Sequence, residues 1–438
     1  MIELFNIFLF FFILLLFFSF PFCIYNKKSI LFNNSSFNNF YTKISFNILF
    51  HINILLLISF FNYLDYYYFY SALVFSIIFN IYYLSKKSER NFELVTFILF
   101  FLIVVSIFLK VSIDLKLEWD GLNHWLPKAL SFFNGNGLLD LNNLGFSEYP
   151  HLGTYIWAFF WKNSYLQYEY FGRFFYIFFY VSSIFCLFEG FFDKNINIKC
   201  ILIFLFSIIT YDLFLFAGYQ EYLIFSSLCI LSKYFYNNLS LDFGKDNFLK
   251  KFFISTLFFQ AIIWFKDEAI FYYVIIFSCF LYFTKKLKKE YLLIIVILFF
   301  PILQYMLQKF IIGTYGFQAE IIHEELYKNL KIKVLLNKVI LISNYILISM
   351  IKYKLWLINM FSLFTLLIFY RNEIIRIKPW IYVLVLNIIL IFLIYIQTPY
   401  DVEFLLKVTL DRIMFQTSGF YFIFTLILLS KIIDLKED

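Results

Sequence analysis

Long apolar runs separated by short polar segments repeat along the whole chain. A helix needs about 20 apolar residues to cross the hydrocarbon core of a bilayer, where only helices and closed barrels satisfy the backbone hydrogen-bonding groups. The runs lack the alternation of barrel strands, so the pattern predicts an all-α polytopic membrane protein, a helical bundle of about 13 spans. The expected spans cover residues 3–24, 44–61, 66–85, 93–113, 171–192, 199–217, 221–236, 251–265, 268–284, 291–309, 354–370, 379–397 and 418–434.

The composition also indicates that this chain is embedded in a membrane. Of its 438 residues 63% are hydrophobic, and the mean hydropathy is +0.80, whereas soluble domains average about 45–50% apolar residues. The first run, 3–24, has no basic residue before it and exceeds the roughly 7–15 residues of a signal-peptide core. We therefore expect it to be a retained span.

The charge distribution disfavours a nucleic-acid partner, and the positions of the cysteines disfavour disulfides and zinc binding. The net charge is +7, but no long basic block with interleaved aromatic residues is present, so no nucleic-acid partner is expected. The five cysteines lie in or beside apolar runs and form no C-x-x-C pair. Buried thiols are therefore favoured over disulfides or zinc ligands at Cys23, Cys186, Cys200, Cys229 and Cys279.

The distribution of lysine and arginine in the short loops predicts the orientation in the membrane. The basic loops, assigned to the cytoplasmic side, lie near 27–43, 86–90, 245–251, 285–289, 371–378 and 431–436. The amino terminus and five segments should then face outward: 114–170, the turns near 217–221 and 265–268, the stretch 310–353 and the loop 398–417.

One apolar segment, 336–352, is expected to lie on the outer surface as an interfacial helix, because asparagine and lysine interrupt it. The resulting topology divides the chain into five parts. These are the N-terminal four spans (1–113), an extracytoplasmic catalytic loop (114–170), central spans (171–309), a second outer stretch with the interfacial helix (310–353) and C-terminal spans (354–438).

The loop 114–170 begins with two carboxylates, Glu118 and Asp120, separated by one residue. Carboxylates at this spacing diverge on a helix but can converge from an extended or turning backbone. Such a pair could hold a divalent cation (Mg or Mn) with a phosphate, or one member could take a proton from an attacking hydroxyl. The alternative is two solvated loop acids.

Further ionisable residues lie in very short turns on the same predicted side: Glu221, Lys266, Asp267 and Glu268. Charges at the ends of spans are costly and usually functional, although each could simply extend to the interface. A polar site covered by the 114–170 loop would gather them, and we expect such a site.

Four other candidates carry weaker signals. His124 and His151 could bind a metal or a phosphate, or be surface or capping residues. Lys128 and Arg412 could bind phosphate, the arginine through two parallel hydrogen bonds, or anchor the chain at the interface. The run 323–325 (His-Glu-Glu) is interpreted as a solvated helix face. Because the chain has no phosphate-binding loop and no dinucleotide fingerprint, use of a cytoplasmic nucleotide sugar is disfavoured.

Several of these motifs resemble those of the GT-C superfamily, the integral-membrane glycosyltransferases that use polyprenyl-phosphate sugars. Their first outer loop has an acidic pair, D-D or E-x-D, like Glu118 and Asp120. The run from Asp120 through Trp125 to Lys128, and the pair Tyr149-Pro150, resemble a bacterial branch related to protein O-mannosyltransferases and aminoarabinose transferases.

Three later motifs follow the same order as in that branch: Gly218-Tyr219-Gln220-Glu221, Trp264 to Glu268, and Thr398-Pro399-Tyr400-Asp401 with the downstream Arg412. The chain departs from the branch at Phe404-Leu405, where Trp-His is usual. The resemblance covers roughly 117–412, and each motif is short.

The resemblance implies a GT-C-like bundle with a large extracytoplasmic loop after the fourth span. It implies an inverting enzyme at the outer face of the bacterial inner membrane, moving a sugar from a polyprenyl-phosphate donor to a cell-envelope glycan, lipid or protein. Asp120 would be the general base, Glu118 and Glu221 would orient the acceptor or hold metal, and cations would neutralise the phosphate. The implied substrate-binding residues are His124, Trp125, Lys128, Tyr149, Lys266, Asp267, Glu268, Asp401 and Arg412.

Two alternatives remain open. A transporter or flippase of lipid-linked sugars would place ionisable residues near mid-span and would show repeat symmetry. A surface-polysaccharide polymerase or ligase usually has its large loop late in the chain. The richest loop here comes early, which favours the transferase.

Overall fold

The computed structural model describes residues 2–22, 24, 39–61, 65–84, 93–145, 147, 149–238, 247–283, 290–310, 332–398 and 401–437. Within these ranges every regular element is a helix, and no strand occurs. The run 323–325, Cys23 and the pair Pro399-Tyr400 lie outside them. Of the cysteines in the described ranges, Cys186, Cys229 and Cys279 are buried free thiols, as expected, whereas the free thiol of Cys200 is only partly buried.

The helices follow the apolar runs of the sequence. The first half contains α1 (Ile2–Phe17), α2 (Phe40–Ile58), α3 (Asp65–Leu84), α4 (Leu94–Asp114), η2 (Gly121–Trp125), α5 (Leu126–Phe133), η3 (Leu138–Asn143), α6 (Leu152–Lys162), α7 (Glu169–Phe188), α8 (Ile196–Thr210) and η4 (Leu213–Phe216). The second half contains α9 (Glu221–Asn238), α10 (Asn247–Phe259), η5 (Gln260–Trp264), α11 (Glu268–Tyr282), α12 (Glu290–Phe310), α14 (Ile332–Lys352), α15 (Lys354–Phe369), α16 (Arg371–Gln397), α17 (Val402–Leu405), η7 (Leu406–Leu410), α18 (Asp411–Tyr421) and α19 (Ile423–Glu437).

Seven helical stretches in the described ranges are long and apolar enough to cross a membrane. They are Phe40–Ile58, Leu94–Asp114, Glu169–Phe188, Tyr291–Gln308, Val334–Lys352, Arg371–Gln397 and Val402–Ile433. Five further apolar helices are shorter. The protein is thus helical and of membrane-embedded character, while the count of thirteen spans stays a prediction.

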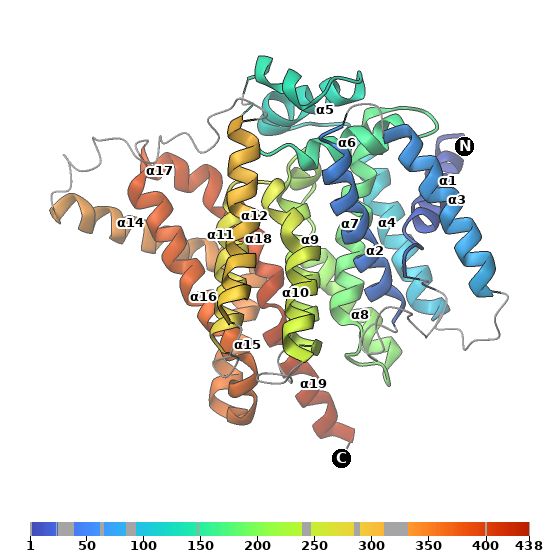
Figure 1. The fold of residues 1–438 in the computed structure, drawn as a ribbon. Helices are drawn as coiled ribbons and strands as arrows, with labels where there is room; N and C mark the ends of the chain where they lie inside the picture. The colour runs from blue at the N-terminus through green and yellow to red at the C-terminus, as the bar shows by residue number, and fades with distance from the viewer. Residues whose placement is uncertain are drawn as a thin grey trace.

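The bundle has a buried centre and an apolar periphery. The candidate span in α7 is completely buried, whereas only 22% of that in α12 is buried. Helix α9 packs most extensively against α18 and α7. Figure 1 shows the short helices α5 and α6 gathered at one end of the bundle, here called the loop end, and the carboxyl terminus at the opposite end.

Helix α14 contains the segment expected to be interfacial. By length and composition it qualifies as a span, and only 17% of its apolar window is buried. In Figure 1, however, α14 lies across the direction of α9, α10 and α12. Its position at a membrane surface stays a prediction.

The segment 398–417 was expected to be a loop, and this prediction is wrong, because helical structure begins at Val402. Asp401 caps this helix, its Oδ1 accepting a hydrogen bond from the Glu403 amide at 2.9 Å. Glu403 and Lys407, one turn apart, pair at 2.7 Å. The polar residues Asp401, Glu403 and Lys407 had suggested a loop, but the cap and the ion pair allow them to lie at a helix.

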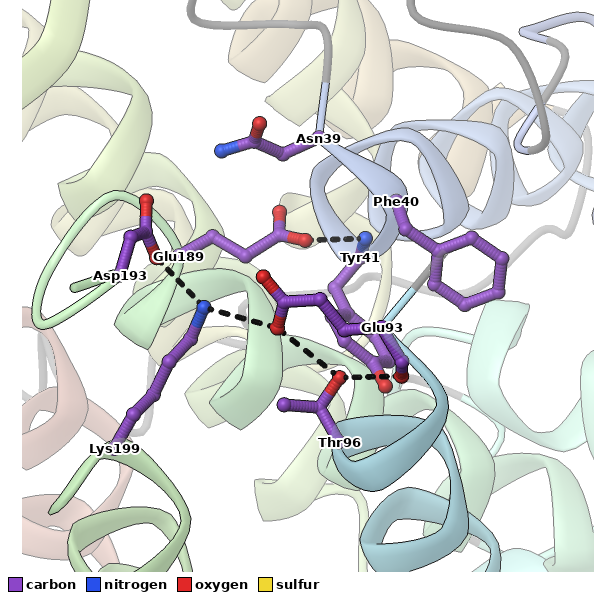
Figure 2. A pocket seen from close by; sticks show the side chains of 8 residues that line it. All are labelled: Asn39, Phe40, Tyr41, Glu93, Thr96, Glu189, Asp193 and Lys199. Carbon is purple, nitrogen blue, oxygen red and sulfur yellow. Dashed lines mark hydrogen bonds and ion pairs between the residues drawn. The ribbon is translucent and has the colours of Figure 1, made fainter. Parts of the chain in front are cut away.

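Polar contacts around Glu189 and Lys199 also join several helices (Figure 2). The carboxylate of Glu189, which follows α7, accepts hydrogen bonds from the amides of Tyr41 and Thr42 at 2.7 and 2.6 Å. It thereby satisfies the first turn of α2. Lys199 of α8 adds ion pairs at 2.7 Å to Asp193 and 3.7 Å to Glu93. We interpret this group as a structural tie between α2, α4, α7 and α8.

Candidate functional site

Five ionisable residues from distant parts of the chain meet near the loop end. Arg412 of α18 pairs through Nη1 with Asp120 Oδ2, and its Nε lies 3.6 Å from Glu221 Oε1. The same glutamate oxygen lies 3.0 Å from Lys266 Nζ, which is 3.7 Å from Glu268 Oε1. We call these five residues the charge cluster. All five are thus joined in one series of contacts, with Arg412, Glu221 and Lys266 at its centre.

The charge cluster is closed at one side and accessible at the other. The Glu221 side chain is 0% exposed and that of Lys266 9%, whereas those of Asp120 and Glu268 are 17% and 28% exposed. Burial alone would lower the pKa of Lys266, but the charges of Glu221 and Glu268 raise it well above its usual value. Lys266 therefore stays protonated across the physiological range.

A close backbone crossing brings Asp120 to the cluster. The amide of Glu118 donates to the carbonyl of Ala217 at 3.0 Å. A Cβ on Gly218, whose φ is +98°, would lie 2.9 Å from the Gly121 Cα, closer than Cβ contacts allow. Glycine at 218 thus permits both the backbone conformation and the close approach.

Tyr219, just after this crossing, completes the site. The guanidinium carbon of Arg412 lies 4.7 Å from the centre of its ring, a cation–π geometry. Burial, and then the charge of Asp120, raise the pKa of Tyr219 to about 12. Its phenol is thus neutral and can donate a hydrogen bond. The Gly218–Glu221 motif contained this residue, but only the glutamate was singled out from the sequence.

Helix α14 holds the beginning of α18 in place. Asp411, next to Arg412, accepts a hydrogen bond from Ser349 Oγ at 2.7 Å and pairs with Lys352 Nζ at 2.7 Å. Both partners lie on α14. The orientation of Arg412 toward the cluster therefore depends on the docking of α14.

The aromatic candidates form a separate group inside the loop. Lys128 is fully buried, and its Nζ donates to the Tyr149 carbonyl at 2.7 Å while lying 5.7 Å from the Trp125 ring centre. The rings of His124 and Tyr149 stack with centroids 5.3 Å apart. These contacts form the core of the loop.

The remaining predicted residues occupy other positions. Glu118 pairs with Lys116, so the two acids of the predicted metal pair engage different cations. No group of three or more His, Cys, Asp or Glu side chains suited to a metal occurs in the ranges that the structure describes, and the divalent cation stays a prediction. Asp401 is an exposed helix cap, and Asp267 holds the N-cap position of α11.

His151 is buried in the loop and is not at the charge cluster's surface. Its Nε2 lies 2.8 Å from Ser59 Oγ at the end of α2, and its ring packs against those of Phe60 and Trp264. Burial, and then the charge of Lys128, lower the pKa of His151 to about 3. The imidazole is therefore neutral and structural.

This burial predicts a pH effect on stability. Between pH 6.5 and 3 the unfolded chain binds a proton at position 151 that the folded state rejects, so acidification should destabilise the protein by about 1.4 kcal/mol per pH unit at this residue. The unfolding temperature of the wild type in detergent should fall more from pH 7 to pH 5 than that of His151→Gln. Parallel curves for the two proteins would contradict a buried neutral imidazole.

Arg173, which is 1% exposed in α7, was not predicted from the sequence. Its Nη1 donates to the carbonyls of Lys116 and Phe216 at 3.1 and 3.3 Å, and its Nη2 to Glu169 Oε2 at 2.9 Å. It thereby ties the start of the loop to η4. An arginine inside an apolar run was itself a signal of such a role.

Comparison with known proteins assigns no family to this arrangement. No protein-family model, no curated protein and no solved structure matches the chain. What the site does is therefore argued from its residues and their geometry.

Proposed function

We propose that this protein is a membrane glycosyltransferase that moves a sugar from a polyprenyl-phosphate carrier to an acceptor at the loop end. The observation that carries the proposal is the charge cluster. Its acids and bases come from the loop, α9, the turn before α11 and α18, and meet in direct ionic contacts. Such convergence in a chain that is otherwise largely apolar needs an explanation.

Stability alone is a weak explanation for the cluster. Removing two charges from water costs several kcal/mol per ion, and apolar side chains of similar volume often stabilise a protein as well or better. Groups of partly buried carboxylates and cations are typical of functional sites. The aminoarabinose and O-mannosyl transferases that the motifs resemble place their acidic pair at this position of the chain, which agrees with a catalytic Asp120.

In the proposed reaction Asp120 takes the proton of the acceptor hydroxyl. The acceptor oxygen bonds to the anomeric carbon from the face opposite the phosphate. The bond between that carbon and the phosphate oxygen breaks, and its electron pair leaves with the polyprenyl phosphate. Asp120 carries the transferred proton away, and the anomeric configuration inverts.

Arg412 and Lys266 would stabilise the leaving phosphate. Both cations are held in place before substrate arrives, by Asp120 and Glu221 respectively. An arriving phosphate would compete with Asp120 for Arg412, so donor binding would release the carboxylate to act as base. Preorganised cations of this kind favour the charge that develops in the transition state.

The test uses the full chain in lipid nanodiscs with a panel of polyprenyl-phosphate hexoses. We expect protein-dependent release of polyprenyl phosphate from at least one donor, with an inverted linkage in the product. Empty nanodiscs serve as the control. Movement of an intact lipid-linked sugar across proteoliposomes, without any donor cleavage, would contradict the proposal and favour a flippase.

A further inference from the structure

A pocket of about 240 Å³ lies next to the crossing that positions Asp120, between the end of α4 and the η4 turn. Its apolar wall is formed by Val111, Phe214, Phe216 and Ala217. Ala217 is the residue whose carbonyl accepts the Glu118 amide. The pocket is thus built on the same backbone crossing as the charge cluster.

The charged lining of this pocket is balanced. Asp114 and Glu118 contribute two negative charges, and Lys116 and Arg173 two positive ones. Lys116 pairs with Glu118. Arg173 donates from Nη1 to two backbone carbonyls and from Nη2 to a carboxylate on its own helix. Since the cations already have partners, the pocket favours an uncharged polar group over a phosphate.

The helices that lead to the pocket carry exposed apolar side chains beside its charged lining. Beside it on α4, Ile113 is 73% exposed, and on α8 Phe204 and Ile208 are 49% and 56% exposed. Phe214 in the pocket wall is itself 41% exposed. Side chains of this kind on apolar helices are suited to contact with lipid. A lipid could therefore reach the pocket along α4 and α8 without passing through water.

The pocket and the charge cluster share a boundary. Glu118 lines the pocket, and Asp120, two residues later, belongs to the cluster. On the facing segment, Ala217 lines the pocket while Tyr219 lies under Arg412. Tyr219 also lies within electrostatic reach of Asp120 and Glu118. A hydroxyl bound in the pocket would be close to the proposed base.

From these observations we infer that the pocket binds the acceptor, and that the acceptor is an uncharged lipid with a hydroxyl-bearing headgroup. This inference rests on the proposed function. The lipid chain lies along α4 and α8, Glu118 accepts a hydrogen bond from the headgroup, and the reacting hydroxyl gives its proton to Asp120. Its oxygen then forms the bond to the anomeric carbon as the bond to the donor phosphate breaks.

Photolabelling tests this assignment without measuring transfer. The wild-type chain in phosphatidylcholine nanodiscs is exposed to diacylglycerol, phosphatidic acid or polyprenyl phosphate, each carrying a diazirine on its apolar chain. We expect diacylglycerol to label peptides covering 111–118 and 213–217, with phosphatidic acid about tenfold less effective. Equal labelling by all three probes, or preferential labelling by polyprenyl phosphate, would overturn the assignment.

Two variants locate the label. Ala217→Leu fills the pocket, and Phe214→Ala removes a half-exposed wall whose loss the fold should tolerate. Each should reduce diacylglycerol labelling about tenfold, whereas Phe299→Ala, at an exposed position of α12 outside the pocket lining, should leave it unchanged. Unreduced labelling in Phe214→Ala, confirmed as folded, would overturn the inference. If diacylglycerol labels the pocket peptides but no donor is cleaved, the proposed glycosyltransferase function is wrong. If the donor is cleaved but the pocket peptides are not labelled, only the assignment of this pocket to the acceptor is wrong.

Discussion

Replacing Asp120 with asparagine is expected to lower sugar transfer by about 10²–10⁴-fold, the usual contribution of a general base. Asparagine keeps the shape of the side chain but cannot accept the acceptor proton. The change also removes the ion pair with Arg412. The measurement is the initial rate of polyprenyl-phosphate release in nanodiscs, normalised to the amount of folded protein.

Asp401→Asn is the matched control for this prediction. It makes the same chemical change at an exposed helix cap. Asparagine caps a helix about as well as aspartate, so we expect little loss of stability or of transfer activity. Expression and membrane insertion of Asp120→Asn should equal those of the wild type. A folded Asp120→Asn protein with undiminished transfer would remove the base assignment.

Replacing Glu221 with glutamine is expected to destabilise the fold by about 3–5 kcal/mol, because it removes one partner of a buried ion pair. Its carboxylate is completely buried and is the closest anion to Lys266. Without it, Lys266 keeps only the longer contact with Glu268. The unfolding free energy can be measured by denaturant titration in detergent, with tryptophan fluorescence as the signal.

Two further proteins separate stability from function at this position. Glu268→Gln, at the more exposed side of the same lysine, should cost less than about 1 kcal/mol. The double replacement Glu221→Leu with Lys266→Met removes both buried charges and should recover much of the lost stability. It should not recover transfer. If Glu221→Gln unfolds like the wild type, the buried pair does not hold the cluster together.

The helical and apolar character of the protein was predictable because it depends on local sequence. Runs such as those in α4 and α7 satisfy the backbone internally and present apolar side chains whatever their neighbours are. Segments 336–352 and 398–417 were harder to interpret, because polar residues interrupt them. Their structure depends on contacts between α14 and α18 through Ser349, Lys352 and Asp411.

The candidate residues of the site were also recognisable, since charges are rare in this chain and stand out at the ends of apolar runs. Their grouping was only partly foreseen. Lys128 was expected at the phosphate but is enclosed in the loop with Tyr149. Glu118 was expected beside Asp120 at one metal, yet it pairs with Lys116. Arg173 went unnoticed within its apolar run.

The sequence by itself thus determined the class of the protein and the short set of polar residues from which a site can be built. Only the tertiary structure decided which of them meet. Asp120 and Arg412 are separated by 292 positions in the chain, so no local pattern encodes their contact. Their pairing results from the packing of α18 against α9 and from the Gly121–Gly218 crossing, because ionic contacts act over a few ångströms in space and not along the sequence.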